Sequence, residues 1–371
     1  MLLDNRSGRL FAYNHTACHL WNLIEAGRPA DQLVCEFADA WGIPASLARS
    51  DIESILALWR GQGLLAAGEA DAAPLAPTVA GDGRCDPVSP PATSAAEWTC
   101  TVGPVTIEFV IGSERLAVIR TMLAHLETPG ASPRARIEVR IAPSDEAVLL
   151  VNGAERSRVF DLGMLVGGVW QTILELVHPD VEWLALIHGA AVSRGGTGIA
   201  LCAPSGSGKS TLTAALTASS FTYLADDLVA ISAPDGEIVP WPAPISIKPG
   251  SIAAITPHRP EVAAAPRYRT KGVEARLLVP PATALQAPQV PLRYLVFPRF
   301  VSGAAPELQP VSSFQALERL LADRVWIGHP ITADRVEAFV AWLNTTPAYA
   351  ATYGSLYDGM RLVEEVIEDV A

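Results

Sequence analysis

The segment with the clearest chemistry reads A-P-S-G-S-G-K-S-T, from Ala203 to Thr211. Glycines at this spacing let successive backbone N–H groups point at phosphate oxygens. Lys209 can then reach the β- and γ-phosphates, and the Ser210 hydroxyl can hold Mg²⁺. This is a phosphate-binding loop of Walker A type, although alanine stands where the motif has its first glycine. We predict that the loop residues binding nucleotide are Ala203, Pro204, Ser205, Gly206, Ser207, Gly208, Lys209, Ser210 and Thr211.

Such a loop works only between a strand and a helix, and the flanking pattern predicts both. The apolar run Gly198–Cys202 indicates a buried strand before the loop, and the apolar residues of Leu212–Leu216 indicate a helix after it. We expect this helix to start at Ser210. Its positive amino-terminal end would add to the attraction for the same anion.

Two neighbouring carboxylates follow the loop, in the segment L-A-D-D that ends at Asp227. Their distance from Ser210 fits a helix, a turn and a second strand returning beside the first. Asp226 and Asp227 would then lie near the terminal phosphate. One could bind Mg²⁺ with Ser210, and the other could accept a proton from an attacking hydroxyl. We expect Asp227, or its neighbour Asp226, to accept the proton, although a motor or switch ATPase could use the same pair for metal alone.

Lysine is scarce, since only three of the 27 basic residues are lysines. A lysine retained in an arginine-rich chain can mark a place where a compact ammonium is needed. Lys248 and Lys271 are therefore predicted to contact phosphate, like Lys209. The alternative is that both persisted by chance.

The motifs of this half resemble those of HPr kinase/phosphorylase. The resemblance rests on I-H-G at Ile187–Gly189, on the loop, and on L-A-D-D-L-V at Leu224–Val229. T-K-G-V at Thr270–Val273 and Y-L-V-F-P-R at Tyr294–Arg299 are similar to a divergent branch of HPr-kinase-related proteins. That branch is found near genes for ribosomally made, modified peptides.

The resemblance covers residues 98–371 and implies a P-loop α/β kinase fold with ATP and Mg²⁺ as cofactors. It also implies that His188 lies beside the transferring phosphate, whereas a lone histidine is otherwise often a core residue. The catalytic candidates are thus Asp227, Asp226, Lys209 and His188, and the metal candidates are Ser210, Asp226 and Asp227. The phosphorylase signature is not recognisable near Pro244–Ser251, so the reverse reaction is not expected.

Residues 1–65 predict a separate unit of winged-helix type. Leu2–Leu3 and Arg9–Tyr13 read as two short strands around a turn, and three amphipathic helices follow. Seven acidic residues against five arginines argue against DNA. The pattern L-L-D-x-x-x-G-x-L-F-A-Y-N resembles the PqqD-like peptide-chaperone domain, which implies that a leader peptide adds as a strand to the hairpin edge against the third helix. A structural interaction module is the alternative. The leader contacts expected are Leu10, Phe11, Ala12, Tyr13, Ile52, Ile55 and Trp59.

The rest of the chain predicts a flexible linker at 66–97, then a kinase unit with an amino-terminal lobe at 98–180 and a P-loop core at 181–371. Five scattered cysteines favour a reducing cytoplasm. No transmembrane or signal segment is apparent, and a net charge of −12 disfavours nucleic acid. The sequence does not decide whether the protein forms a homo-oligomer or contacts other peptide-maturation enzymes.

Together these features predict an α/β kinase that uses ATP to phosphorylate a serine or threonine of a ribosomally made precursor peptide recognised through its leader. A lasso-type precursor is one candidate. Two alternatives remain: a nucleotide-gated peptide chaperone without transfer, and a regulatory serine kinase acting on a folded protein.

Overall fold

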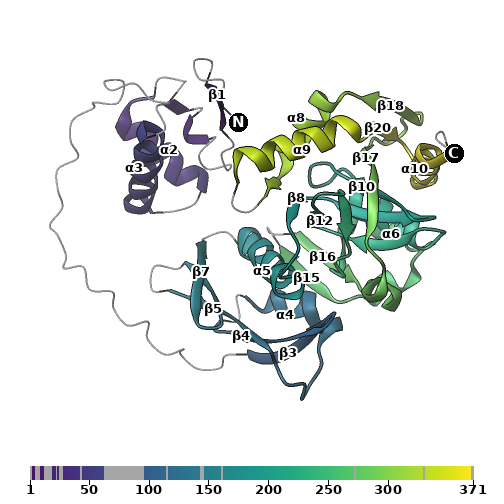
Figure 1. The fold of residues 1–371 in the computed structure, drawn as a ribbon, viewed down its shortest axis with the longest axis horizontal. Helices are drawn as coiled ribbons and strands as arrows, with labels where there is room; N and C mark the ends of the chain where they lie inside the picture. Colours follow the sequence, from purple (N-terminus) through teal and green to yellow (C-terminus); the bar gives the residue numbers. More distant parts are fainter. Residues whose placement is uncertain are drawn as a thin grey trace. The chain divides into compact units, whose positions relative to one another are not determined.

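The chain forms two compact units, Met1–Pro87 and Val88–Ala371 (Figure 1). The computed structural model describes residues 2–4, 9–11, 19–21, 23–24, 28–41, 44–61, 96–113, 116–142, 146–159, 162–270, 273–328 and 331–368. The predicted linker lies almost wholly outside the described residues. Its last two residues were assigned wrongly, because they begin strand β3, Ala96–Val102, which alternates buried and exposed side chains.

The first unit has the predicted hairpin and helices. Strands β1 (Leu2–Asp4) and β2 (Arg9–Phe11) pair antiparallel. Helical residues follow at 19–21 and 23–24, then helices α2 (Ala30–Trp41) and α3 (Ala45–Gly61). Their apolar stripes meet in a small core of their own, formed by Leu20, Val34, Phe37, Ala38, Ala48, Ile52 and Trp59.

The second unit begins with a five-stranded sheet. Its strands run in the order β3, β4 (Val105–Ile111), β5 (Ala135–Ile141), β6 (Ala147–Val151) and β7 (Ala154–Val159). Only the β4–β5 pair is parallel. The connections to this sheet include α4 (Ala117–Leu123), the 3₁₀ turn η2 (Ala124–Leu126) and α5 (Leu162–Val177).

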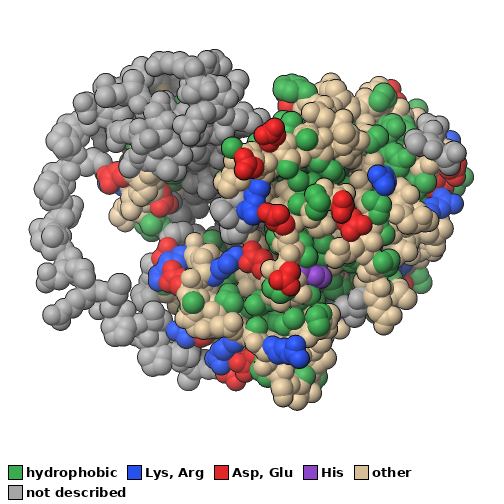
Figure 2. All heavy atoms as spheres, in the orientation of Figure 1, with side chains coloured by type: hydrophobic (Ala, Val, Ile, Leu, Met, Phe, Trp, Pro, Cys, Tyr) green, Lys and Arg blue, Asp and Glu red, His purple; other side chains and the backbone are tan. Residues whose placement is uncertain are grey.

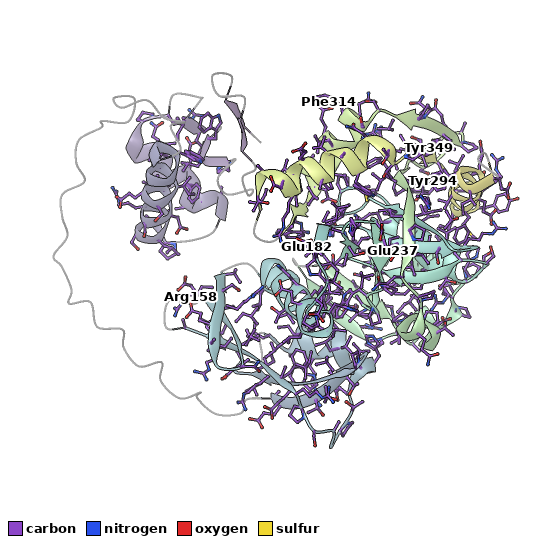
Figure 3. The ribbon with its side chains drawn as sticks, viewed as in Figure 1. Arg158, Glu182, Glu237, Tyr294, Phe314 and Tyr349 are labelled. Carbon is purple, nitrogen blue, oxygen red and sulfur yellow. The ribbon has the colours of Figure 1, made fainter. Side chains whose placement is uncertain are left out.

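A ten-stranded mixed sheet holds the predicted phosphate-binding loop. Its main path runs β11-β9-β10-β17-β13-β12-β8-β19, and β20 lies between β17 and β18. Figure 3 shows Tyr294 of β17 near Tyr349 of β20, with ring centroids 6.4 Å apart. The strands are β8 (Trp183–Ile187), β9 (Ala190–Arg194), β10 (Thr197–Leu201), β11 (Thr222–Ala225), β12 (Val229–Ser232), β13 (Glu237–Val239), β17 (Val290–Phe300), β18 (Glu307–Val311), β19 (Val325–Ile327) and β20 (Ala348–Tyr353).

Further helices and a small sheet surround this sheet. The small sheet has the order β14 (Ile245–Ile247), β16 (Val273–Leu278), β15 (Arg267–Thr270). The helices are α6 (Lys209–Thr217), α7 (Pro249–Ile255), α8 (Ser313–Asp323), α9 (Ala333–Thr345) and α10 (Leu356–Glu368), with 3₁₀ turns η3 (Pro260–Ala263) and η4 (Ala282–Gln286). Helix α6 starts one residue earlier than expected.

The strand that precedes the aspartate pair does not return beside β10, so that prediction was wrong. Strand β9 lies between them and pairs antiparallel with both β10 and β11. The reason is local: a tight turn through Gly195 and Gly196, both with positive φ, folds β9 and β10 into a hairpin. The hairpin partner therefore occupies the edge of β10 that β11 was expected to take.

The five-stranded sheet packs against the main sheet through one continuous apolar core. Trp170 of α5 meets Trp241, with ring centroids 5.3 Å apart. Within the described part of the chain, no helix is long and apolar enough to cross a membrane. On the face in Figure 2, described Lys and Arg side chains are scattered among acidic and apolar ones.

Candidate active site

The phosphate-binding loop leaves β10, turns at two glycines and enters α6. Gly206 and Gly208 have φ values of 97° and 98°, a region that side chains other than glycine rarely adopt. A Cβ atom at Gly208 would also lie 2.8 Å from the Tyr353 hydroxyl. The loop is fastened to strand β17, because the Phe300 amide donates to the Ser207 carbonyl at 3.2 Å. Both glycines are thus required by the backbone conformation of the loop.

Lys209, the first residue of α6, is buried and folds back over the loop. Its ammonium donates to the carbonyl oxygen of Ala203. Burial lowers the pKa of Lys209, and the nearby carboxylates of Asp323 and Asp226 oppose that shift. An ammonium held by a backbone carbonyl can exchange that partner for a phosphate oxygen.

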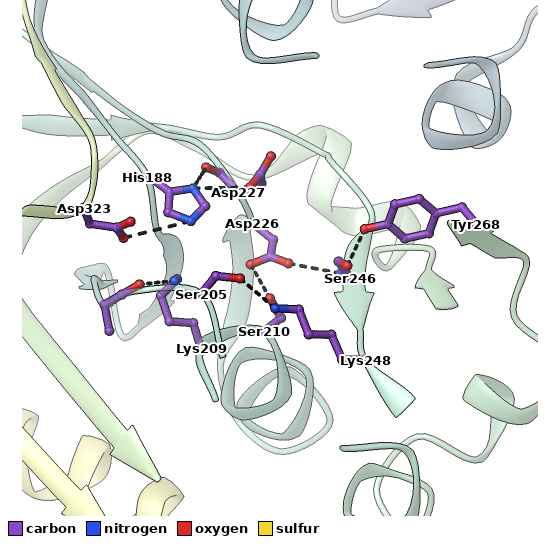
Figure 4. A network of polar contacts seen from close by, with 11 residues as sticks. His188, Ser205, Lys209, Ser210, Asp226, Asp227, Ser246, Lys248, Tyr268 and Asp323 are labelled. Carbon is purple, nitrogen blue, oxygen red and sulfur yellow. Dashed lines mark hydrogen bonds and ion pairs between the residues drawn. The ribbon is translucent and has the colours of Figure 1, made fainter. Parts of the chain in front are cut away.

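Asp226 points inward, to the start of α6, and only 2 % of it is exposed. Its Oδ1 accepts a hydrogen bond from the Ser210 hydroxyl at 3.2 Å, and its Oδ2 accepts one from the Ser246 amide at 3.2 Å (Figure 4). Burial and then the charge of Asp227 raise the pKa of Asp226 to about 6, against the two hydrogen bonds. Among the described residues, no ion pair joins this carboxylate to a cation, although the charge of Lys209 acts on it.

Asp227 points the other way. It adopts a left-handed conformation with φ of 68°, which is uncommon outside glycine and asparagine-like residues. Because of this turn, the carboxylate of Asp226 faces Ser210 and the carboxylate of Asp227 faces His188. The Asp227 side chain stays 46 % exposed, and its Oδ1 lies 3.3 Å from His188 Nδ1. Burial by surrounding groups raises its pKa, but the contacts with His188 and the charge of Arg324 outweigh this and lower it.

His188 joins the aspartate turn to a carboxylate that the sequence did not reveal. Its Nδ1 lies 3.0 Å from the Asp227 carbonyl, and its Nε2 lies 4.0 Å from Oδ2 of Asp323. Asp323 ends α8, and it reaches the site because β19 pairs with β8. No motif marks this residue. Only that long-range strand pairing would have identified it.

Another lysine, Lys248, contacts the loop through Ser205. Lys248 donates to the Ser205 hydroxyl at 2.6 Å, and the Ser246 hydroxyl lies 2.6 Å from that of Tyr268. Lys248 directly follows β14 and is the residue before the first turn of α7. Lys248 is therefore beside the predicted phosphate site. Lys271 lies outside the described residues.

Two further loop residues and the predicted metal ligands remain to be placed. The Pro204 carbonyl accepts from the Ser207 amide at 3.2 Å, and Thr211 lies in the first turn of α6. No group of three or more His, Cys, Asp or Glu side chains converges to hold a metal among the described residues. A hydroxyl and a carboxylate oxygen do meet at Ser210 and Asp226, and Mg²⁺ commonly takes such ligands together with substrate phosphates.

The predicted leader contacts that the structure describes lie in strand β2 and in helix α3. Leu10 and Phe11 lie in β2, while Ala12 and Tyr13 lie outside the described residues. Ile52 and Trp59 are buried in the core of the unit, and Ile55 is half-buried. Their contact with a leader stays a prediction.

Comparison with known families identifies one part of the chain. Residues 1–65 match the family model of coenzyme PQQ synthesis protein D (PqqD). The chain therefore carries an amino-terminal PqqD domain, followed by a mixed α/β unit. A comparison with curated proteins finds no match to the chain.

Proposed function

We propose that this protein is an ATP-dependent kinase that phosphorylates a serine or threonine hydroxyl of a ribosomally made precursor peptide. The observation that carries the proposal is the opposite orientation of two adjacent aspartates beside a phosphate-binding loop. Asp226 faces Ser210 and Asp227 faces solvent and His188. A metal-holding group and a proton acceptor are the two carboxylate roles that phosphoryl transfer requires.

In this reaction the peptide hydroxyl oxygen attacks the γ-phosphorus of ATP. The bond between that phosphorus and the β–γ bridging oxygen breaks, ADP leaves, and the hydroxyl proton passes to the Asp227 carboxylate. Lys209 and the loop amides bind the phosphates and stabilise charge on the transferring group. Mg²⁺, when bound by Ser210 and Asp226, neutralises phosphate charge. Catalysis then consists mostly of positioning and electrostatics.

The PqqD domain supports the choice of a peptide as substrate. We assign to it recognition of the precursor's leader, through a strand added at the β1–β2 hairpin. Because both units belong to one chain, a leader held by the PqqD domain would raise the local concentration of the acceptor hydroxyl near the kinase unit toward roughly millimolar.

The direct test is mass spectrometry of the cognate precursor after incubation with the protein and Mg-ATP. We expect the peptide to gain the mass of one phosphate, and Lys209→Ala to abolish the gain while leaving the circular dichroism spectrum unchanged. Hydrolysis of ATP without any change in peptide mass would overturn the kinase assignment and favour a nucleotide-gated chaperone.

Leader recognition has its own test. Removal of residues 1–65 should raise KM for the full precursor and leave the rate on a leaderless peptide unchanged. An unchanged KM for the full precursor would mean that the PqqD domain does not bind the leader. Transfer to a folded protein but not to the precursor would instead favour a regulatory kinase.

A further inference from the structure

A third carboxylate lies at the aspartate–histidine end of the site, and nothing in the proposed reaction uses it. Asp323 is 15 % exposed, and its Oδ2 is buried without a hydrogen-bond partner among the described residues. A buried carboxylate oxygen is unfavourable unless it is paired. Of the described ionisable groups, His188 lies 4.0 Å away, and the charge of Asp323 acts on the pKa of Lys209 and of Cys202.

The backbone holds Asp323 in place opposite His188. The residue after it, Arg324, accepts a hydrogen bond from the His188 amide at 2.9 Å. Val325 of β19 then pairs with Ile187 of β8, which directly precedes the histidine. The register of two strands therefore sets the separation of the two side chains, so the contact does not depend on a flexible loop.

The imidazole ring of His188 has an acceptor at each nitrogen. Nδ1 faces the carbonyl and Oδ1 of Asp227, and Nε2 faces Oδ2 of Asp323 (Figure 4). The hydrogen bond made by one ring nitrogen determines whether the other nitrogen carries a proton. At 4.0 Å the second contact is longer than a hydrogen bond, and such contacts often tighten when substrates bind.

We propose that Asp323 is a positioning residue that, through His188, holds the Asp227 carboxylate in the orientation needed to accept a proton. This inference rests on the proposed kinase function. It predicts that loss of the Asp323 charge slows turnover and leaves nucleotide binding nearly unchanged, because the Asp226–Ser210 side of the site is untouched.

The experiment uses the full chain and three single variants. Asp323→Asn keeps the size and removes the charge, Asp323→Glu keeps the charge, and Glu318→Gln removes a charge from the exposed face of the same helix. We expect Asp323→Asn to lower kcat by about 10- to 100-fold, as for other side chains that orient a functional histidine. KM for ATP should change less than about twofold, Asp323→Glu should recover most of kcat, and Glu318→Gln should match the wild type.

A double-mutant cycle tests whether Asp323 acts through His188. In a His188→Gln background, Asp323→Asn should cost little further activity. Additive losses, or a large change in ADP affinity, would show action through Lys209 or through general structure and would overturn the proposal.

A nuclear magnetic resonance readout separates failure of this inference from failure of the kinase assignment. The seven histidines can be labelled with ¹⁵N, and the His188 signals assigned by their loss in His188→Gln. Asp323→Asn should move the Nε2 signal of His188, and Glu318→Gln should not. A moved signal in a protein that transfers no phosphate supports the contact and refutes the kinase. An unmoved signal in an active kinase overturns the role of Asp323.

Discussion

Asp226 should destabilise the folded protein, and its replacement by asparagine should reveal this. The carboxyl is 2 % exposed, and its pKa is raised from 3.8 to about 6, chiefly by burial. Between these two pH values the folded state binds more protons than the unfolded state, so stability falls as pH rises through this window. Above pH 6 the lost stability amounts to about 3 kcal/mol, at 1.36 kcal/mol per pKa unit.

Asp226→Asn removes the buried charge and can keep both hydrogen bonds. The amide oxygen can accept from the Ser246 N–H, and the amide nitrogen can donate to the Ser210 hydroxyl. We therefore expect the variant to be more stable than the wild type by up to about 3 kcal/mol at pH 7, which corresponds to a rise in Tm of roughly 5–10 °C for a unit of this size. The gain should shrink toward zero near pH 4.

Differential scanning calorimetry of the full chain from pH 4 to pH 8 measures the effect. Asp227→Asn is the matched control, because it makes the same chemical change one residue later. The pKa of Asp227 is lowered, so its ionised form contributes stability that is present above its ordinary pKa and lost as pH falls. Neutralising it should therefore not raise Tm at pH 7. A lower Tm for Asp226→Asn at pH 7, or a pH-independent difference, would refute the reasoning.

Three further predictions concern the loop and its neighbours. Asp227→Asn should lower turnover by roughly 100-fold or more and leave Mg-ADP affinity measured by calorimetry nearly unchanged; loss of Mg-ADP binding would make Asp227 the metal ligand instead. Lys248→Arg replaces the compact ammonium that contacts Ser205 by a broad planar group, so KM for ATP should rise with no fall in Tm; wild-type kinetics would show that this lysine is not needed. Gly208→Ala should abolish nucleotide binding, because φ is 98° and the new Cβ would approach Tyr353; Gly250→Ala, in open space, is the control.

The sequence predicted the part of the site whose residues lie close together along the chain. The strand, loop and helix around Lys209 form within about twenty consecutive residues, and the buried runs on either side leave little choice of element. The contact between Ser210 and Asp226 follows from the same arrangement, even though β9 separates β11 from β10. Because β9 is antiparallel to both β10 and β11, β10 and β11 run in the same direction. The loop after β10 and the aspartates after β11 therefore lie at the same edge of the sheet, one strand apart.

Two features depend on information that a single sequence does not display. Asp323 lies far along the chain from the other site residues, and it meets His188 only through the β19–β8 register. The sequence favoured Asp227 as the proton acceptor but left Asp226 as the alternative, because both residues are aspartates at consecutive positions. Their difference comes from the left-handed backbone of Asp227, which the residue type permits and does not require.

The aspartate pair shows how one dipeptide can supply two kinds of carboxylate. Burial beside Ser210 raises the pKa of Asp226, and an arriving cation would relieve the same unfavourable charge. Contact with His188 lowers the pKa of Asp227 and keeps this exposed carboxylate ionised, which is the state that the proposed proton acceptor needs. Because the backbone turn between them creates both environments, a substitution that relaxed φ at Asp227 would disturb both roles together.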